Sequence, residues 1–456
     1  MPHTTRMPGS AGALLTDLYQ LTMAQAYFRE DMAETAVFEL FVRRLPPARR
    51  FLLAAGLERA LELIASFRFA PAELEFLAAQ GMFAQPFLDY LGAFRFSGTV
   101  HAMPEGSPFF AEEPILRVTA PIIEAQLLES RLINIIHFQT LIASKAARCV
   151  IAAQGRRLLD FGMRRAHEGD AALLAARAAY LAGFDGTATV EAGRQWGIPI
   201  SGTVAHSYIE AHDDEEQAFR SFTRAMPGRT TLLIDTYDTI RAAGKIARLQ
   251  SELSAQGSPH GVESVRIDSG DLGAQAREVR RILDEHGCRD VRIALSGSLD
   301  EHQIAALVAG GVPADAFGVG TSLDVSADAP ALDMAYKLQM YAGRPRRKRS
   351  PGKVTWPGAK QVFREFDASG TASCDRIVLE GEQAAGAPLL AEVMRAGRAI
   401  GASRALADLR DDCRRQVRTL PQYVLRLEER PARDGSTAYP VIRSAAVEAL
   451  ALELLS

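Results

Sequence analysis

The segment Arg157-Leu158-Leu159-Asp160-Phe161 begins a series of short apolar runs that decides the fold class of this sequence. Further runs follow it at intervals of roughly 25 to 40 residues, the length of a strand, a helix and two loops. They are residues 198–203, 231–235, 265–268, 291–296 and 316–320. Because amphipathic helical stretches separate the runs, the pattern predicts an α/β fold built from parallel β–α units.

The last residues of these runs favour a barrel over a doubly wound sheet. They are polar or glycine in nearly every case: Asp160, Thr203, Asp235, Asp268, Ser296 and Gly320. Barrels collect their chemistry at the carboxyl ends of many strands, whereas doubly wound sheets concentrate it at one switch point. The sequence also lacks the G-x-G-x-x-G phosphate loop of dinucleotide-binding folds.

The parts of the chain outside this array have mixed signals. A helix is expected over 14–29, with Thr16 and Asp17 as capping residues, and strands over 36–42, 96–103 and 114–119. A long helix is expected over 121–154; its most apolar part, 132–144, is too short to span a bilayer and predicts a buried helix. We therefore expect an N-terminal domain over 1–120, the β–α array over 121–343, and a C-terminal region over 344–456 that contains a strand at 376–379.

Bulk properties exclude several classes of protein. The formal net charge of −3 gives no general attraction to nucleic acid or to anionic membranes. The four cysteines are far apart, which argues against a zinc site or a disulfide framework, and residues 1–11 have no signal-peptide core. A cytoplasmic protein is expected. The basic run 344–349 predicts a solvated loop; the alternative is a mobile segment near a phosphate-rich active site.

Several strand-end residues have side chains suited to a phosphorylated sugar and a flat acidic ring. Phe161 can stack on a heterocycle, and Arg164 can bind a carboxylate or phosphate with two hydrogen bonds, although a salt-bridged surface arginine is equally expected. His206 can act as a base or nucleophile, against the commoner case of a structural histidine.

Three loops combine acidic and hydroxyl residues: 235–239, 266–271 and 296–300. Carboxylates accept hydrogen bonds from sugar hydroxyls and bind Mg²⁺, but the same residue types also cap helices. The segment 318–322 contains the glycines and hydroxyls of a phosphate cradle, a weak signal on its own.

In order along the chain, T-D-L-Y-Q-L-T-M (16–23), D-F-G-M-R-R (160–165), G-T-V-A-H-S (202–207) and I-D-S-G-D-L (267–272) resemble the nicotinate phosphoribosyltransferase family. The resemblance extends from about residue 14 to 364. It implies an incomplete TIM-like (β/α) barrel, with a second α/β domain formed by the N- and C-terminal parts. The implied reaction joins nicotinate to 5-phosphoribosyl-1-pyrophosphate in NAD salvage, giving nicotinate mononucleotide and pyrophosphate, with ATP as co-substrate and Mg²⁺ as cofactor.

The resemblance also implies roles for individual residues. His206 would be the phosphohistidine that couples ATP hydrolysis to the reaction, and Asp235 and Asp268 would be catalytic. The metal ligands are not identified. Tyr19 would come from the neighbouring subunit of a homodimer. The implied substrate-binding residues are Tyr19, Phe161, Arg164, Thr203, Arg266, Ser296, Gly297, Gly320 and Thr321.

Ala188 favours the acid over the amide as substrate. The related nicotinamide enzyme has an aspartate here, which would repel a carboxylate, whereas many nicotinate enzymes have serine. The alternatives are a nicotinamide enzyme, a quinolinate enzyme that works without ATP, and a catalytically silent homologue that acts as a scaffold.

Overall fold

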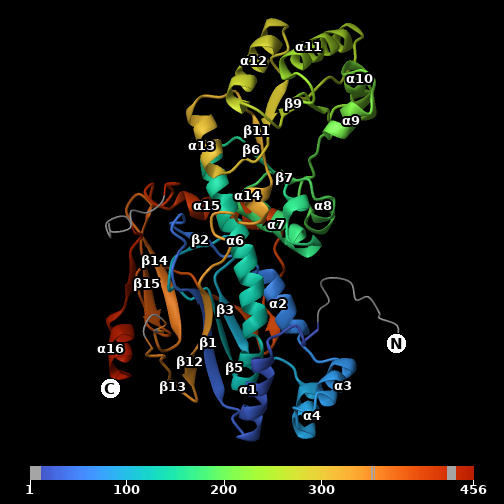
Figure 1. The fold of residues 1–456 in the computed structure, drawn as a ribbon. Helices are drawn as coiled ribbons and strands as arrows, with labels where there is room; N and C mark the ends of the chain where they lie inside the picture. The colour runs from blue at the N-terminus through green and yellow to red at the C-terminus, as the bar shows by residue number, and fades with distance from the viewer. Residues whose placement is uncertain (1–11, 351–352, 354, 429–437, 456) are drawn as a thin grey trace. The chain divides into compact units, whose positions relative to one another are not determined.

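In the computed structural model, residues 12–350, 353, 355–428 and 438–455 are described, and the chain divides into two compact units (Figure 1). Unit 1 comprises Met1–Ser144 and Ala329–Ser456, and unit 2 comprises Lys145–Asp328. The boundaries differ from those expected at 120/121 and 343/344, because helix α5 (Ile122–Leu127) and strand β12 (Met334–Tyr341) pack within the sheet layers of unit 1. The segment 1–11, expected to lack a signal peptide, lies outside the described residues.

Unit 2 is organised around a six-stranded parallel sheet with the order β7-β6-β11-β10-β9-β8. Its edge strands, β7 and β8, are connected through the segment between them: Thr187 forms a parallel bridge with Ile200, and the Thr203 hydroxyl donates to the Thr231 carbonyl at 2.9 Å. The strands are β6 (Arg157–Asp160), β7 (Gly186–Thr187), β8 (Thr231–Leu233), β9 (Ser264–Ile267), β10 (Arg292–Leu295) and β11 (Ala316–Val319).

Five of the six expected strands of this array are confirmed as β6, β8, β9, β10 and β11. The expected strand at 198–203 is wrong, because only Ile200 pairs with a neighbouring strand and Pro199 has no N–H to donate. The two-residue strand β7 was missed, since so short a segment has no detectable alternation.

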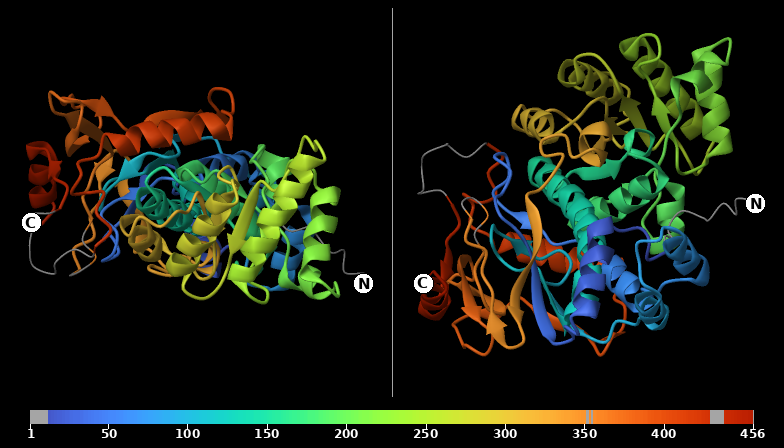
Figure 2. Two further views of the ribbon diagram at one scale, coloured as in Figure 1. Left: turned by 90° about the horizontal axis from the view of Figure 1, so that it is seen from above. Right: turned by 60° about the horizontal axis from the view of Figure 1, so that its bottom comes forward.

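Helices connect the strands of unit 2, and α11 lies beside both α10 and α12 (Figures 1 and 2). They are α7 (Gly169–Ala182), α8 (Val190–Trp196), α9 (His206–Glu210), α10 (Glu215–Ala225), α11 (Thr239–Ala255), α12 (Leu272–Glu285), α13 (Glu301–Ala309) and α14 (Thr321–Asp324), with a 3-10 turn at Met163–Arg165.

Unit 1 mixes segments from both ends of the chain, drawn in blue and in orange to red in Figure 2. Its largest sheet has the order β13-β12-β1-β5-β3-β17-β18; a second has β16-β14-β15-β19, and β2 pairs with β4. The strands are β1 (Thr35–Val42), β2 (Leu52–Leu53), β3 (Thr99–Ala102), β4 (Pro108–Phe109), β5 (Leu116–Pro121), β12 (Met334–Tyr341), β13 (Arg344–Pro345), β14 (Lys360–Phe366), β15 (Ala372–Leu379), β16 (Ala387–Pro388), β17 (Ala391–Arg395), β18 (Arg398–Ala399) and β19 (Val441–Arg443).

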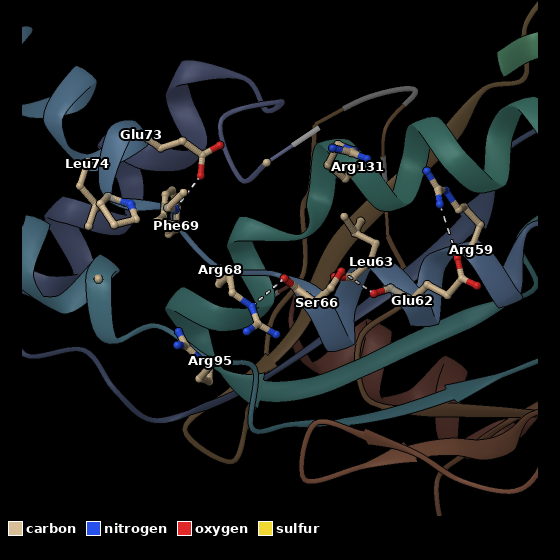
Figure 3. Close-up of a pocket in the computed structure, with 14 residues that line it drawn as sticks. Arg59, Glu62, Leu63, Ser66, Arg68, Phe69, Glu73, Leu74, Arg95 and Arg131 are labelled. Atoms are coloured by element: carbon tan, nitrogen blue, oxygen red, sulfur yellow. Dashed lines mark hydrogen bonds and ion pairs between the residues drawn. The ribbon is translucent and has the colours of Figure 1, made fainter. Parts of the chain in front are cut away.

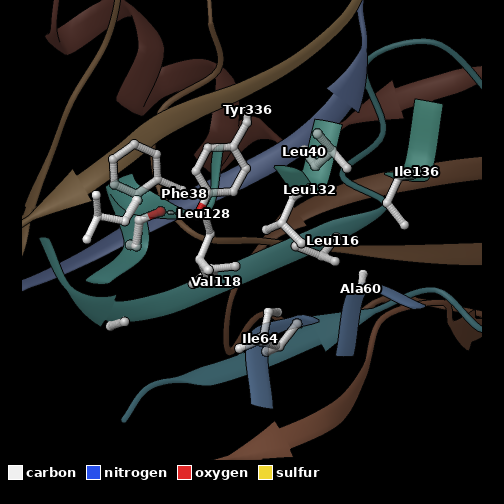
Figure 4. Packing of buried hydrophobic residues seen from close by; sticks show 14 of the residues in the cluster. Phe38, Leu40, Ala60, Ile64, Leu116, Val118, Leu128, Leu132, Ile136 and Tyr336 are labelled. Atoms are coloured by element: carbon white, nitrogen blue, oxygen red, sulfur yellow. Dashed lines mark hydrogen bonds between the residues drawn. The ribbon is translucent and has the colours of Figure 1, made fainter. Parts of the chain in front are cut away.

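The core of unit 1 explains why helices pack against this sheet. Phe38 of β1 stacks on Tyr336 of β12 with ring centroids 4.9 Å apart, and Val118 of β5 and Leu132 of α6 belong to the same buried cluster (Figure 4). The helices are α1 (Leu18–Arg29), α2 (Leu57–Ser66), α3 (Pro71–Ala79), α4 (Gln85–Ala93), α5 (Ile122–Leu127), α6 (Glu129–Ala153), α15 (Leu406–Arg418) and α16 (Ala445–Glu453). Asp17 occupies the N-cap position of α1, but its carboxylate accepts from Ser130 instead of capping the helix.

The apolar segment 132–144 lies in α6, the one described helix that is long and apolar enough to cross a membrane by length and composition. Of its most apolar window, 78% is buried inside the protein, as in the central helix of a globular core. The expectation of a buried helix at this position is confirmed.

The basic run 344–349 is folded against the carboxyl-terminal part of unit 1. Arg347 donates to the backbone of Thr355 and of Ala451, and its guanidinium lies 5.8 Å from the ring centroid of Trp356. Arg349 donates to the Leu455 carbonyl at 3.2 Å. The run therefore anchors the end of the chain, although most of its side chains are exposed.

Candidate active site

Unit 2 contains a cavity of about 860 Å³ that lies along the strands of the parallel sheet. Of the candidate residues, it is lined by Phe161, Thr203, Arg266 and Ser296, together with Ala188. A volume of this size accommodates a substrate of a few hundred daltons. The structure thus brings together side chains that are up to 135 residues apart in the sequence (161 to 296).

The Phe161 ring is held against the wall of this cavity by its neighbours. A Cβ on Gly318 would lie 2.5 Å from a ring carbon, so only glycine leaves room for the ring here. On another side the guanidinium carbon of Arg266 lies 5.5 Å from the ring centroid, within cation–π range. An aromatic face fixed in this way is suited to orient a flat heterocycle.

Arg266, Asp268 and Ser296 form a hydrogen-bonded group, which we call the cationic cluster after the guanidinium group of Arg266. The Arg266 Nε donates to Ser296 Oγ at 2.6 Å, its Nη2 donates to Asp268 Oδ1 at 2.5 Å, and Ser296 donates to the same oxygen at 2.6 Å. Gly297 has a φ of +98°, and a Cβ there would lie 1.9 Å from the Asp268 carbonyl oxygen. The predicted Gly297 is thus required by close backbone approach.

Asp235 lies beside this cluster, and only one of its two carboxylate oxygens accepts hydrogen bonds from the described residues. Its Oδ2 accepts from the Asp268 N–H at 3.0 Å and the Ser269 hydroxyl at 2.6 Å. Its Oδ1 is buried, has no hydrogen-bond partner among the described residues, and lies 4.0 Å from His206 Nε2. The other ring nitrogen of His206 lies 3.1 Å from Thr236 Oγ1. His206, Asp235 and Asp268 are therefore neighbours in space.

The same residues fit a magnesium ion that is shared with phosphates. The described residues contain no group of three or more His, Cys, Asp or Glu side chains that could hold a metal alone. Mg²⁺ in phosphate chemistry needs only one or two carboxylates, the rest of its shell being phosphate oxygens and water. The unpartnered Asp235 Oδ1 is a suitable ligand of this kind.

A second pair of carboxyl groups, which we call the buried pair, consists of Asp160, the last residue of β6, and Asp324, the last residue of the short helix α14 that follows β11. Asp160 accepts from the Gly162 N–H at 2.8 Å and from Thr187 Oγ1 at 2.7 Å. A Cβ on Gly162 would lie 2.2 Å from Asp324 Cγ, so that glycine makes room for the Asp324 carboxyl group. Burial, the charge of Asp160 and a hydrogen bond to Asp160 raise the pKa of Asp324 to about 9.

The raised pKa of Asp324 and the lack of a donor to its oxygens imply that this pair shares a proton at neutral pH. A charged Asp324 would leave both oxygens without a partner among the described residues, whereas a protonated Asp324 can donate to Asp160. Burial also raises the pKa of Asp160. We conclude that Asp324 is the neutral member and that the pair fixes the backbone on either side of Phe161.

Other predicted residues lie elsewhere or are already engaged. Arg164 is exposed and is not among the described residues that line the cavity. Tyr19 is 46% exposed on α1 of unit 1. Gly320 precedes α14, and Thr321, its first residue, is exposed. The Thr203 hydroxyl donates to a backbone carbonyl, so it has only its lone pairs free for a ligand.

The acidic loops combine the two roles that the sequence left open. The later acid of each loop caps a helix: Asp238, Asp271 and Asp300 accept from the first N–H groups of α11, α12 and α13. In the first two loops the earlier acid, Asp235 or Asp268, is left for chemistry. Sequence reasoning missed Thr187 and Asp324, and nothing in the sequence connects either of them with Asp160.

Comparisons with known proteins show the family to which the chain belongs. Residues 14–137 match the nicotinate phosphoribosyltransferase N-terminal domain, and residues 156–342 match the nicotinate phosphoribosyltransferase family. The chain is 48% identical over 431 residues to nicotinate phosphoribosyltransferase pncB2 of Mycobacterium tuberculosis, covering 94% of this chain and 91% of that protein. It is 41% identical over 380 residues to the nicotinate phosphoribosyltransferase of Bacillus subtilis, covering 81% and 77%. The crystal structure of human nicotinic acid phosphoribosyltransferase has a TM-score of 0.84 at 29% identity and covers 96% of this chain and 99% of that one.

Proposed function

We propose that this chain, which belongs to the nicotinate phosphoribosyltransferase family, joins nicotinate to 5-phosphoribosyl-1-pyrophosphate and releases pyrophosphate, a step of NAD salvage. The observation that carries the proposal is the cavity in which the Phe161 ring lies next to Arg266 and Ser296 of the cationic cluster. An aromatic wall suits the pyridine ring, and the guanidinium suits an anion.

The mechanism follows from the charges that develop in this reaction. Nicotinate is oriented on Phe161 so that its ring nitrogen attacks C1 of the ribose as the bond from C1 to pyrophosphate breaks. Positive charge develops on the ribose ring, and the carboxylates of Asp235 and Asp268 stabilise it. Arg266 offsets the negative charge of the departing pyrophosphate, while Ser296 keeps its guanidinium in place.

Magnesium would be held by Asp235, through its unpartnered oxygen, together with phosphate oxygens of the substrate. When bound, it would supply positive charge to the pyrophosphate. The chain's own contribution is to keep this carboxylate fixed, since its other oxygen accepts from Asp268 N and Ser269 Oγ.

ATP coupling would pass through His206, whose imidazole is 41% exposed and lies 4.0 Å from Asp235 Oδ1. A ring nitrogen attacks the γ-phosphorus of ATP, ADP leaves, and water later hydrolyses the N–P bond to release phosphate. The added negative charge would organise the basic groups and the metal.

His206→Ala should abolish coupling between ATP hydrolysis and product formation, while leaving a slower ATP-independent reaction. The matched control is His212→Ala. In the unmodified chain a ring nitrogen of His212 lies 2.8 Å from the Tyr208 carbonyl oxygen. A His206→Ala enzyme that still hydrolyses ATP in step with product formation would contradict this role.

The architecture that we propose for unit 2 is an incomplete TIM-like barrel. Its strands follow one another around the sheet in sequence order, with β11 next to β6, and the segment around Ile200 connects the two edge strands.

We also propose a cytoplasmic homodimer in which Tyr19 of one subunit enters the pyridine pocket of the other. Arg164 would then bind the nicotinate carboxylate, and Gly320 and Thr321 the 5′-phosphate. Exposure of Tyr19, Arg164 and Thr321 in the single chain supports these contacts.

The first experiment is a direct assay of the purified protein with nicotinate, 5-phosphoribosyl-1-pyrophosphate and Mg²⁺, with and without ATP. We expect nicotinate mononucleotide, formed faster with ATP, and much less product from nicotinamide. Product from nicotinamide instead would favour the amide enzyme. Product formed with release of CO₂ from quinolinate, without ATP, would favour the quinolinate enzyme. No product from any pyridine would favour a silent scaffold.

A further inference from the structure

Unit 1 contains a pocket of about 720 Å³ that shares no residue with the candidate active site. Four arginines line it, and they come from four different segments (Figure 3). Arg59 lies on α2, Arg68 between α2 and α3, Arg95 just after α4, and Arg131 on α6. Such a convergence of guanidinium groups from separate segments is a property of the fold rather than of one helix face.

The acids of the pocket do not neutralise this charge. Two glutamates line the pocket together with the four arginines. Glu73 accepts from the Ala70 N–H at 2.8 Å and is thereby used as a helix cap. Glu62 lies 3.5 Å from Arg59, in the same helix. The six charged side chains that line the pocket therefore carry a formal net charge of +2.

Arg131 shows most clearly that a partner is missing. Its Nε and Nη1 atoms are buried and have no hydrogen-bond partner among the described residues. Burial lowers the pKa of Arg131, and the positive charge of Arg59 lowers it further. A buried cation without a partner is costly, and a second cation nearby adds to the cost. An anion between these groups would remove both penalties.

We propose that this pocket is a binding site for a small phosphate-bearing anion, held by Arg131, Arg59 and Arg68. Guanidinium groups match phosphate oxygens with two-point hydrogen bonds, which favours phosphate over a less charged ligand. The pocket is large enough for a nucleotide, and Leu63, Phe69 and Leu74 provide apolar surface for an organic part. The inference does not depend on the proposed enzymatic activity.

Calorimetric titration of the full chain tests the site with three probes: inorganic phosphate, pyrophosphate and AMP. Because the proposed reaction would also place phosphates in the candidate active site, the number of bound molecules per chain is the quantity compared. We expect Arg131→Met to lose one of them, or to bind it at least about tenfold more weakly, since each charge-assisted hydrogen bond contributes about 1.5–3 kcal/mol. Arg398→Gln, at an exposed position of unit 1, is the matched control and should bind as the unmodified protein does.

The pattern among the probes identifies the ligand class. Binding of AMP but not of inorganic phosphate at the lost site would assign it to an organic phosphate, and equal binding of both would assign it to the free ion. Arg68→Gln, an exposed side chain that is cheap to replace, should weaken the same site and guards against a folding defect in Arg131→Met. The proposal is overturned if both variants bind every probe with the stoichiometry and affinity of the unmodified chain.

Thermal unfolding supplies a readout that a merely structural arginine would not give. Without anion, Arg131→Met should raise the melting temperature, because a half-buried charge, two of whose nitrogens have no partner among the described residues, is replaced by an apolar side chain of similar length. With anion, the unmodified chain should gain more than the variant does, as binding to the folded state requires. A variant that melts lower than the unmodified protein without anion and responds equally to it would contradict the proposal.

Discussion

The cationic cluster and the buried pair lie at the carboxyl edge of the same parallel sheet, and both are built on aspartates, yet they are opposite in design. In the cationic cluster, Asp268 is paired with Arg266 and Ser296. In the buried pair, no cation of the described residues contributes to the pKa of either Asp160 or Asp324, and the carboxyl groups face each other. The position at a strand end is therefore not enough to make a carboxylate an electrostatic catalyst.

The difference is one of charge state. A carboxylate next to a guanidinium stays ionised and can act on charge that develops in a reaction. Two carboxyls buried together cannot both ionise, so one keeps its proton and becomes a hydrogen-bond donor. We infer that the cationic cluster acts on the substrate and that the buried pair positions Phe161, the residue that follows Asp160.

The largest effect should come from removing charge in the cationic cluster. Asp268→Asn keeps the shape but loses the negative charge, and we expect kcat of the phosphoribosyl transfer to fall by about 10²–10³-fold. The measurement is a steady-state assay of nicotinate mononucleotide. Asp271→Asn, in the same loop, is the matched control: Asp271 only caps α12, so a change of a few-fold at most is expected. Equal losses in the two variants would remove the distinction.

An intermediate effect should follow from placing a charge on the wall beside the buried pair. Ala188 lines the cavity, and its N–H donates to the Asp160 carbonyl at 2.8 Å. Ala188→Asp should raise KM for nicotinate by about tenfold or more through repulsion between carboxylates, with a smaller effect on nicotinamide. Ala188→Asn has the same size without the charge and separates repulsion from crowding. If both variants raise KM equally for the two pyridines, the acid specificity does not depend on charge at this position.

The sequence was sufficient for those parts of the fold and site that have local signals. Apolar runs with polar ends located five of the six strands, because buried parallel strands need continuous apolar residues. Phe161 and Ser296 were found because each lies at or next to a strand end, whereas the role of Arg266 was implied by the family resemblance. The Asp324–Asp160 contact spans 164 residues (324 − 160), and no local pattern encodes it. The four arginines of unit 1 were missed for the same reason, since each is ordinary in its own segment.

The smallest effect on activity, and the one most specific to the buried pair, should come from Asp324→Asn. An amide donates a hydrogen bond to Asp160 as the protonated acid does, so activity should stay within about threefold. In contrast, Asp324→Leu cannot donate and should lower activity by loosening the backbone around Phe161. Similar activities of the Asn and Leu variants would mean that the hydrogen bond does not position the ring.

The pH dependence of stability gives a second and sharper measurement on Asp324→Asn. The pKa of Asp324 is about 9 in the folded protein and about 3.9 in an unfolded chain, so the folded state holds an extra proton between these values. The contribution of Asp324 to stability is therefore fully present below about pH 4 and is lost as the pH rises toward 9, by at most about 1.4 kcal/mol for each pH unit. Asparagine cannot ionise, so the variant should gain in urea midpoint over the unmodified chain at pH 8.5 more than at pH 5.5. A difference that does not change with pH would show that Asp324 is ionised in the folded protein, and the contrast between the two regions would fail.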